Sequence, residues 1–62
     1  MNSKEIIKEL ELEIQKLNSY ILDTEWNNTN YKSLMYLVKE IQHNKECIKT
    51  IKQIEFKSKI KD

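Results

Sequence analysis

Apolar residues in the first third of the chain recur at alternating spacings of three and four. This spacing is typical of a helix with one apolar face, the seam through which a coiled-coil helix contacts its neighbour. Asn2 precedes the pattern and is suited to cap the helix, with Glu5 in the capping-box position. The sequence therefore predicts a helix over residues 3–22. Its seam residues are Ile7, Leu10, Ile14, Leu17 and Ile21.

The same spacing resumes in the second half of the chain and predicts a helix over residues 31–56. Its seam residues are Leu34, Leu37, Ile41, Asn44, Ile48 and Ile51. Residues 54–62 alternate in a strand-like way, but a lone strand would have no partner here, so we expect a frayed or disordered tail over residues 57–62. Residues 23–30 are rich in Asn and Thr, which are poor helix formers, and Asn tolerates the left-handed conformation that turns need. Because the chain has no Gly and no Pro, this segment is the predicted turn.

Two seams joined by one short turn predict an all-α fold, a coiled-coil-like antiparallel hairpin that forms a single domain over residues 1–62. Both seams fit one register, in which the numbers of facing residues add up to 51, as for Leu17 with Leu34 and Leu10 with Ile41. The register places Asn44 opposite Ile7. A polar residue in a seam fixes register or oligomeric state in coiled coils, or else lies where the hairpin frays, and both interpretations are open.

In this register the end of the second helix extends beyond the start of the first. Its apolar residues then have nothing in the hairpin to cover them, and a two-helix seam by itself buries little surface. We therefore expect self-association, two hairpins forming a four-helix bundle, together with a protein partner of unknown identity. Trp26 at the turn either packs on its neighbours or serves as an interface hot spot. The predicted partner-binding residues are Trp26, Ile51, Ile54, Phe56 and Ile60.

Composition removes most catalytic chemistry from consideration. Without Gly and Arg there is no phosphate-cradling loop and no guanidinium fork, and a chain of 62 residues has little room for a deep pocket. A single Cys47 excludes an intrachain disulfide and a cysteine-built zinc site. His43 lies four residues before Cys47 and could place a base beside a thiol, but we expect a solvated imidazole and a small buried thiol. Glu9 and Glu13 are interpreted as a solvated face. We predict no enzyme, no cofactor and no metal.

Charge is distributed unevenly along the chain. Residues 1–30 hold three Lys and six acidic residues, whereas residues 31–62 hold eight Lys and four acidic residues. A basic stripe on the second helix supports an alternative function, a hairpin dimer that binds RNA or DNA phosphates. In length and layout the chain resembles the small plasmid copy-control hairpins that bind RNA loops, although it shares no motif with them. The nucleic-acid-binding residues of this alternative are Lys45, Lys49, Lys52 and Lys59.

A more remote alternative is an aspartyl-phosphate phosphatase of the sporulation phosphorelay, whose signature is Ser-Gln-Glu-Leu-Asp. The segment that most resembles it is Val38–Gln42, in which only Glu40 is identical. The first eight residues contain no secretory apolar stretch, and the longest apolar run is too short to span a membrane. We expect a cytoplasmic protein, in the host cytoplasm if phage-encoded, and the codons of the favoured residues indicate an AT-rich genome. The leading hypothesis is a non-enzymatic interaction module, a regulator, inhibitor or adaptor from a phage or mobile element.

Overall fold

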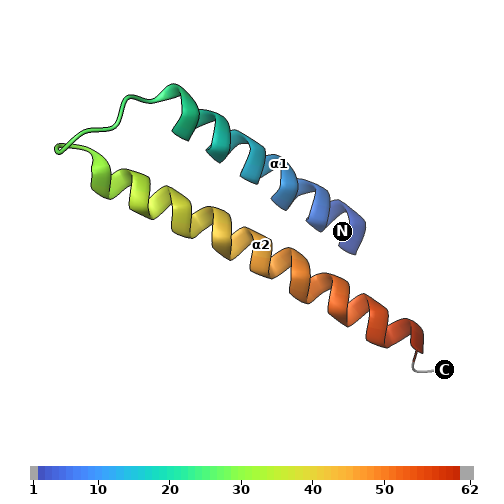
Figure 1. The fold of residues 1–62 in the computed structure, drawn as a ribbon. Helices are drawn as coiled ribbons and strands as arrows, with labels where there is room; N and C mark the ends of the chain where they lie inside the picture. The colour runs from blue at the N-terminus through green and yellow to red at the C-terminus, as the bar shows by residue number, and fades with distance from the viewer. Residues whose placement is uncertain (1, 61–62) are drawn as a thin grey trace.

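The computed structural model describes the backbone of residues 2–60 and the side chains of residues 2–57. Two helices, α1 (Ser3–Asp23) and α2 (Tyr31–Ile60), run antiparallel and pack against each other as a hairpin (Figure 1). The molecule measures 54 × 16 × 15 Å, so its cross-section is only as wide as a pair of helices. The prediction of an all-helical hairpin is confirmed, whereas dimerisation into a bundle stays a prediction.

The start of α1 is fixed by the predicted cap. Asn2 has an extended backbone, and its side-chain oxygen accepts a hydrogen bond from the Glu5 amide at 2.9 Å. Its carbonyl accepts one from the Ile6 amide at 3.1 Å. The side-chain bond thus satisfies the Glu5 amide, which a helix start would otherwise leave without a partner, and the Ile6 bond is the first of the helical ladder.

The end of α1 lies at Asp23, one residue beyond the predicted end. Thr24 leaves the helical conformation, and its hydroxyl donates to the Tyr20 carbonyl at 2.6 Å. A threonine side chain that bonds a carbonyl of the preceding turn competes with the backbone ladder, and the chain then departs in an extended direction.

The connection between the helices is held by asparagine side chains. The Asn27 side-chain oxygen accepts from the Thr29 amide at 2.8 Å, and the Asn30 side-chain oxygen accepts from the Asn27 amide at 2.8 Å. The Asn30 side-chain amide also donates to the Glu25 carbonyl at 3.1 Å. No residue in the described part of the chain adopts a positive φ angle. The turn therefore forms without the left-handed conformation that Asn tolerates, because side-chain hydrogen bonds turn the chain instead.

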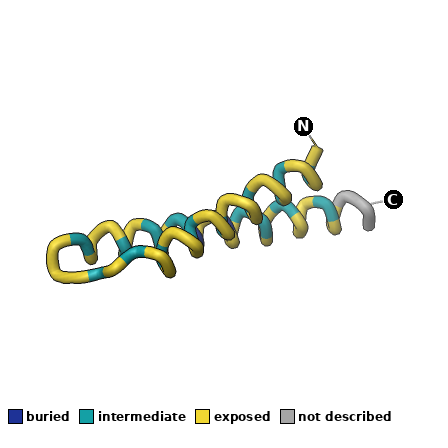
Figure 2. The backbone as a smooth tube through the Cα atoms, turned by 90° about the horizontal axis from the view of Figure 1, so that it is seen from above, coloured by how far each residue is buried: buried dark blue, intermediate teal, exposed yellow. Residues whose placement is uncertain are grey.

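Burial follows the two predicted seams. The seam residues of both helices are half-buried or buried, whereas most positions around them are exposed, and Figure 2 shows this intermediate burial recurring along the two helices. Among residues 2–57, however, only Ile41, at 7% exposure, and Asn44, at 4%, are buried. A single pair of helices covers one side of each seam residue and leaves the others open to water.

The far end of α2 differs from the prediction. The helix continues to Ile60, whereas the sequence predicted an end at residue 56 and a frayed or disordered tail over residues 57–62. Residues 57–60 contain neither Gly nor Pro, so nothing in them breaks the helix. Residues 61 and 62 lie outside the described residues. As the register predicted, α2 continues past the beginning of α1 (Figure 1).

Candidate functional site

The surface of the hairpin is rich in large apolar side chains. Nine of them are exposed among the residues whose side chains are described, from Val38 at 40% to Leu22 at 83%. Isolated apolar residues on a surface need no explanation, but so many beside one buried apolar residue indicate a surface that is incomplete without a partner. The nine are Leu12, Tyr20, Leu22, Tyr31, Met35, Tyr36, Val38, Ile54 and Phe56.

The first candidate surface is the overhang, which we define as residues 49–60 of α2. Of its predicted partner-binding residues, Ile51 is half-buried, while Ile54 is 62% and Phe56 is 64% exposed. The side chain of Ile60, which is also predicted to bind a partner, lies outside the described side chains. The overhang therefore presents an apolar surface in the region where the sequence predicted one.

A basic hollow lies on the overhang around Phe56. Its volume is about 380 Å³, and Lys49, Lys52 and Lys57 line it together with Gln53. Two members of the predicted basic stripe, Lys49 and Lys52, are thus brought together, whereas Lys45 lines a different hollow. The side chain of Lys59 lies outside the described residues. Three ammonium groups around an exposed aromatic ring suit an anionic ligand.

Trp26 caps the turn end of the hairpin. Its indole N–H donates to the Ile21 carbonyl at 2.8 Å, and its ring meets that of Tyr20 edge to face, with centroids 6.3 Å apart. It is half-buried, so part of the ring remains accessible. These contacts match the interpretation in which Trp26 packs on its neighbours, and its role at an interface stays a prediction.

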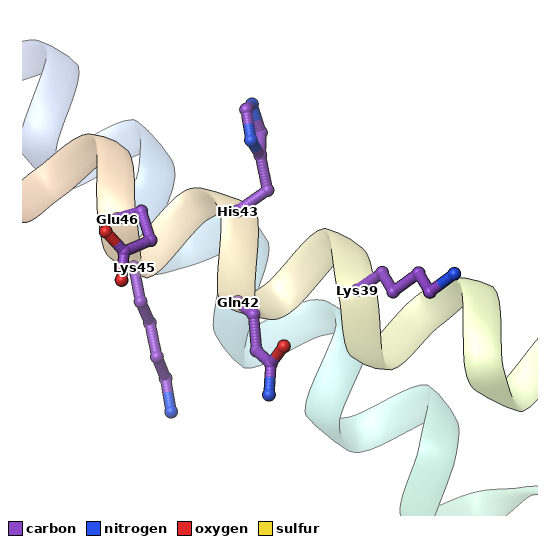
Figure 3. Close-up of a pocket in the computed structure, with 5 residues that line it drawn as sticks. All are labelled: Lys39, Gln42, His43, Lys45 and Glu46. Carbon is purple, nitrogen blue, oxygen red and sulfur yellow. The ribbon is translucent and has the colours of Figure 1, made fainter.

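His43 and Cys47 approach each other on the outer surface of α2. The thiol sulfur lies 3.7 Å from the histidine Nε2 atom, as the four-residue spacing suggested. A hollow on α2 is lined by His43 and Lys45 together with Lys39, Gln42 and Glu46. Figure 3 shows His43 and Lys45 pointing away from α2 in opposite directions, so the side chains that line this hollow do not converge on one point. The described residues include no group of three or more His, Cys, Asp or Glu side chains arranged to hold a metal ion.

The sequence interpretation missed a groove between the helices near the turn, which we name the tyrosine groove. It has a volume of about 610 Å³, and the residues that line it include Leu17 and Tyr20 from α1 and Tyr36 and Leu37 from α2. Lys16 and Lys32 also line it, one from each helix. A signal was present in the sequence: each tyrosine directly precedes a seam residue, and in an antiparallel hairpin such positions share one side.

Asn44 is the polar exception within the helix pair. Its side-chain nitrogen is buried and has no hydrogen-bond partner among the described residues. An unpaired buried amide costs about 1–3 kcal/mol of stability. The structure thus places Asn44 well inside the interface, against the interpretation that it lies where the hairpin frays.

No family model, characterised protein sequence or solved structure matches this chain. Within the described residues, neither helix combines the length and apolar character needed to cross a membrane. The fold is a two-helix hairpin whose candidate functional features are its exposed apolar and basic surfaces.

Proposed function

We propose that this protein is a non-enzymatic interaction module, a regulator, inhibitor or adaptor that binds other polypeptides through its apolar helix faces. The observation that carries the proposal is the contrast in burial between Ile41 and the nine large apolar side chains that remain exposed. Burying a large aliphatic or aromatic side chain contributes about 1.5–3 kcal/mol. A partner that covers a few of them therefore gains enough free energy for specific binding.

The overhang is the surface that we propose for self-association. The helix α2 continues past the beginning of α1 (Figure 1), and Ile54 and Phe56 near its end are exposed. A second hairpin would cover them when two hairpins form a four-helix bundle. Self-association and binding of a different protein are compatible, since the tyrosine groove lies toward the opposite end of the hairpin. The module thus has separate surfaces for the two kinds of contact.

Sedimentation equilibrium of the full chain tests the proposal. We expect a reversible dimer, and we expect the double variant Ile54→Asp/Phe56→Asp to shift it toward monomer at the same concentration. Both positions are exposed in the hairpin, so the helical circular dichroism of the variant should be retained. The matched control is Leu12→Asp, an exposed apolar position on α1 that should leave the dimer unchanged.

The second arm of the test uses the tagged chain to isolate a stoichiometric protein complex, with the same variants as controls. A complex that the double variant or a tyrosine-groove variant disrupts, and Leu12→Asp does not, supports binding through the assigned surfaces. A chain that stays monomeric, fully helical and without a partner would contradict the proposal.

The basic hollow around Phe56 favours a second candidate function, binding of nucleic acid. Lysines neutralise phosphates with release of counterions, and an exposed aromatic ring offers a stacking surface for a base. This candidate predicts that a labelled single-stranded oligonucleotide binds with a steep loss of affinity as salt rises. Lys49→Glu/Lys52→Glu should abolish that binding, while Lys8→Glu, a lysine on α1 outside the hollow, should leave most of it.

A further inference from the structure

We infer that the tyrosine groove is the docking site for an acidic amphipathic helix of a partner protein, which inserts apolar side chains between Tyr20 and Tyr36. The inference rests on the proposed interaction function and adds to it the chemistry of the partner. Nothing in the sequence interpretation assigned a role to this groove.

The shape of the groove suits a row of apolar side chains. Leu17 and Leu37 are half-buried and form its floor, while Tyr20 at 58% and Tyr36 at 64% exposure form walls that reach into solvent. A volume of about 610 Å³ is enough for several side chains. A groove between two helices with an apolar floor is the surface onto which amphipathic helices dock.

The charge of the groove decides the kind of helix. Lys16 on α1 and Lys32 on α2 are the charged groups that line it, and no acidic side chain joins them among the described residues. Carboxylates that flank the apolar row of an incoming helix would face these ammonium groups, whereas lysines there would be repelled. Complementary rim charges raise the association rate and suppress wrong partners.

The same charges disfavour a second copy of this chain in the groove. In a two-fold symmetric contact each groove would face itself, so Lys16 and Lys32 would meet Lys16 and Lys32 of the other copy. Four ammonium groups around one apolar contact oppose association. We therefore assign self-association to the overhang and the tyrosine groove to a heterologous, acidic helix.

Trp26 acts as a positioning residue for the groove. Its ring packs edge to face on Tyr20, and its hydrogen bond to the Ile21 carbonyl holds the ring against the last turn of α1. The orientation of Tyr20 is therefore coupled to Trp26. As the chain has only one Trp, its fluorescence reports on the occupancy of the groove.

The test is a titration with a synthetic probe, a fluorescein-labelled amphipathic helix of about 15 residues with Leu and Phe on one face and Glu on the other. One control peptide carries Lys in place of every Glu, and a second has the acidic composition in scrambled order. We expect saturable binding of the acidic helix alone, measured by anisotropy, with a parallel change in Trp26 emission. Equal binding of the acidic and basic helices would overturn the inference.

Groove variants locate the binding. Tyr36→Ala should lower the affinity for the acidic helix at least about tenfold, as expected for a residue at the centre of an interface. The matched control Tyr31→Ala lies outside the groove and should leave this affinity unchanged. The charge reversal Lys16→Glu/Lys32→Glu should transfer binding to the basic helix. All four positions are exposed or at the rim, and retained circular dichroism shows that each variant still folds.

The remaining outcomes separate this inference from the proposed function. If Ile54→Asp/Phe56→Asp abolishes binding of the acidic helix and Tyr36→Ala does not, the module still binds polypeptides but the tyrosine groove is the wrong surface. A dimer that Tyr36→Ala dissociates assigns the groove to a second copy and overturns the inference. If oligo(dT) displaces the acidic helix, and Tyr36→Ala abolishes this displacement, the groove is assigned to nucleic acid and the inference is also overturned.

Discussion

The two ends of the hairpin differ in whether their exposed groups find partners within the chain. At the turn, the chain leaves α1 with polar backbone groups to satisfy, and Thr24, Asn27 and Asn30 supply hydrogen bonds while Trp26 covers the last turn. At the other end α2 continues beyond α1, and Ile54 and Phe56 stay in water. The polar groups of the turn are thus satisfied from within the chain, whereas the apolar side chains Ile54 and Phe56 of the overhang remain exposed.

Together with the proposed association through the overhang, this difference predicts that folding and binding depend on different parts of the chain. The helical pair derives its stability from the turn and from the middle of the seam, where Ile41 is buried. The overhang contributes little to that stability because it has no second helix to pack on. Substitutions should therefore fall into two groups, those that unfold the hairpin and those that change only its associations.

The largest effect is expected for Ile41→Ala, in the middle of the seam. Truncation of a buried Ile costs about 2–5 kcal/mol, and we expect about 3 kcal/mol here. A domain of this size has only a few kcal/mol of stability, so much of the helical circular dichroism should be lost. Urea unfolding measures the change, and Leu12→Ala, at an exposed position of α1, is the control at about 0.5 kcal/mol or less. Equal effects of the two variants would mean that the hairpin has no core at Ile41.

The next largest effect is expected for Trp26→Ala at the turn. The variant loses the edge-to-face contact with Tyr20 and the hydrogen bond to the Ile21 carbonyl, together worth about 2 kcal/mol. Trp26→Phe keeps an aromatic ring but no N–H group, and should lose about half as much. If Trp26→Ala leaves the urea midpoint unchanged, the contacts of the turn end do not stabilise the hairpin, and the contrast drawn between the turn and the overhang is wrong.

Asn44→Leu should change stability in the opposite direction. The variant removes a buried amide nitrogen that has no partner and adds apolar surface at the same place, so we expect a gain of about 1 kcal/mol. The same variant should admit alternative registers, because a polar seam residue restricts them. Urea unfolding reads the gain, and sedimentation velocity reads any broadening of the oligomer distribution. A loss of stability would show that Asn44 is hydrogen-bonded in solution.

The seams, the cap at Asn2 and the helix that overhangs follow from sequence because each depends on local spacing or on one side chain. The turn depends on more than local spacing. The Asn-rich segment was located correctly, but its geometry depends on which side chain accepts from which amide, and residue types do not specify that. The extension of α2 to Ile60 was not predicted, because the strand-like alternation of residues 54–62 obscured the absence of any helix breaker.

The tyrosine groove was missed for a different reason. Only the seam residues, which become the floor of the groove, were paired across the two helices, and the apolar positions beside them were assigned to a wide apolar stripe without being paired. Tyr20 and Tyr36 lie in different helices and meet only once the hairpin closes. A surface formed by two elements needs the register before its residues can be paired, and the register was used only to find the core and the overhang.

The smallest effect on folding is expected for Phe56→Ser in the overhang, and this makes it the sharpest test of the separation between folding and binding. Phe56 is 64% exposed, so the unfolding free energy of the dilute monomer should change by about 0.5 kcal/mol or less. As the protein concentration rises, the wild-type chain should gain apparent stability through association, because binding that occurs only in the folded state stabilises it. The variant should gain less, so the two urea midpoints should diverge with concentration. Midpoints that already differ by the full amount at the lowest concentration would show that the overhang packs within its own hairpin.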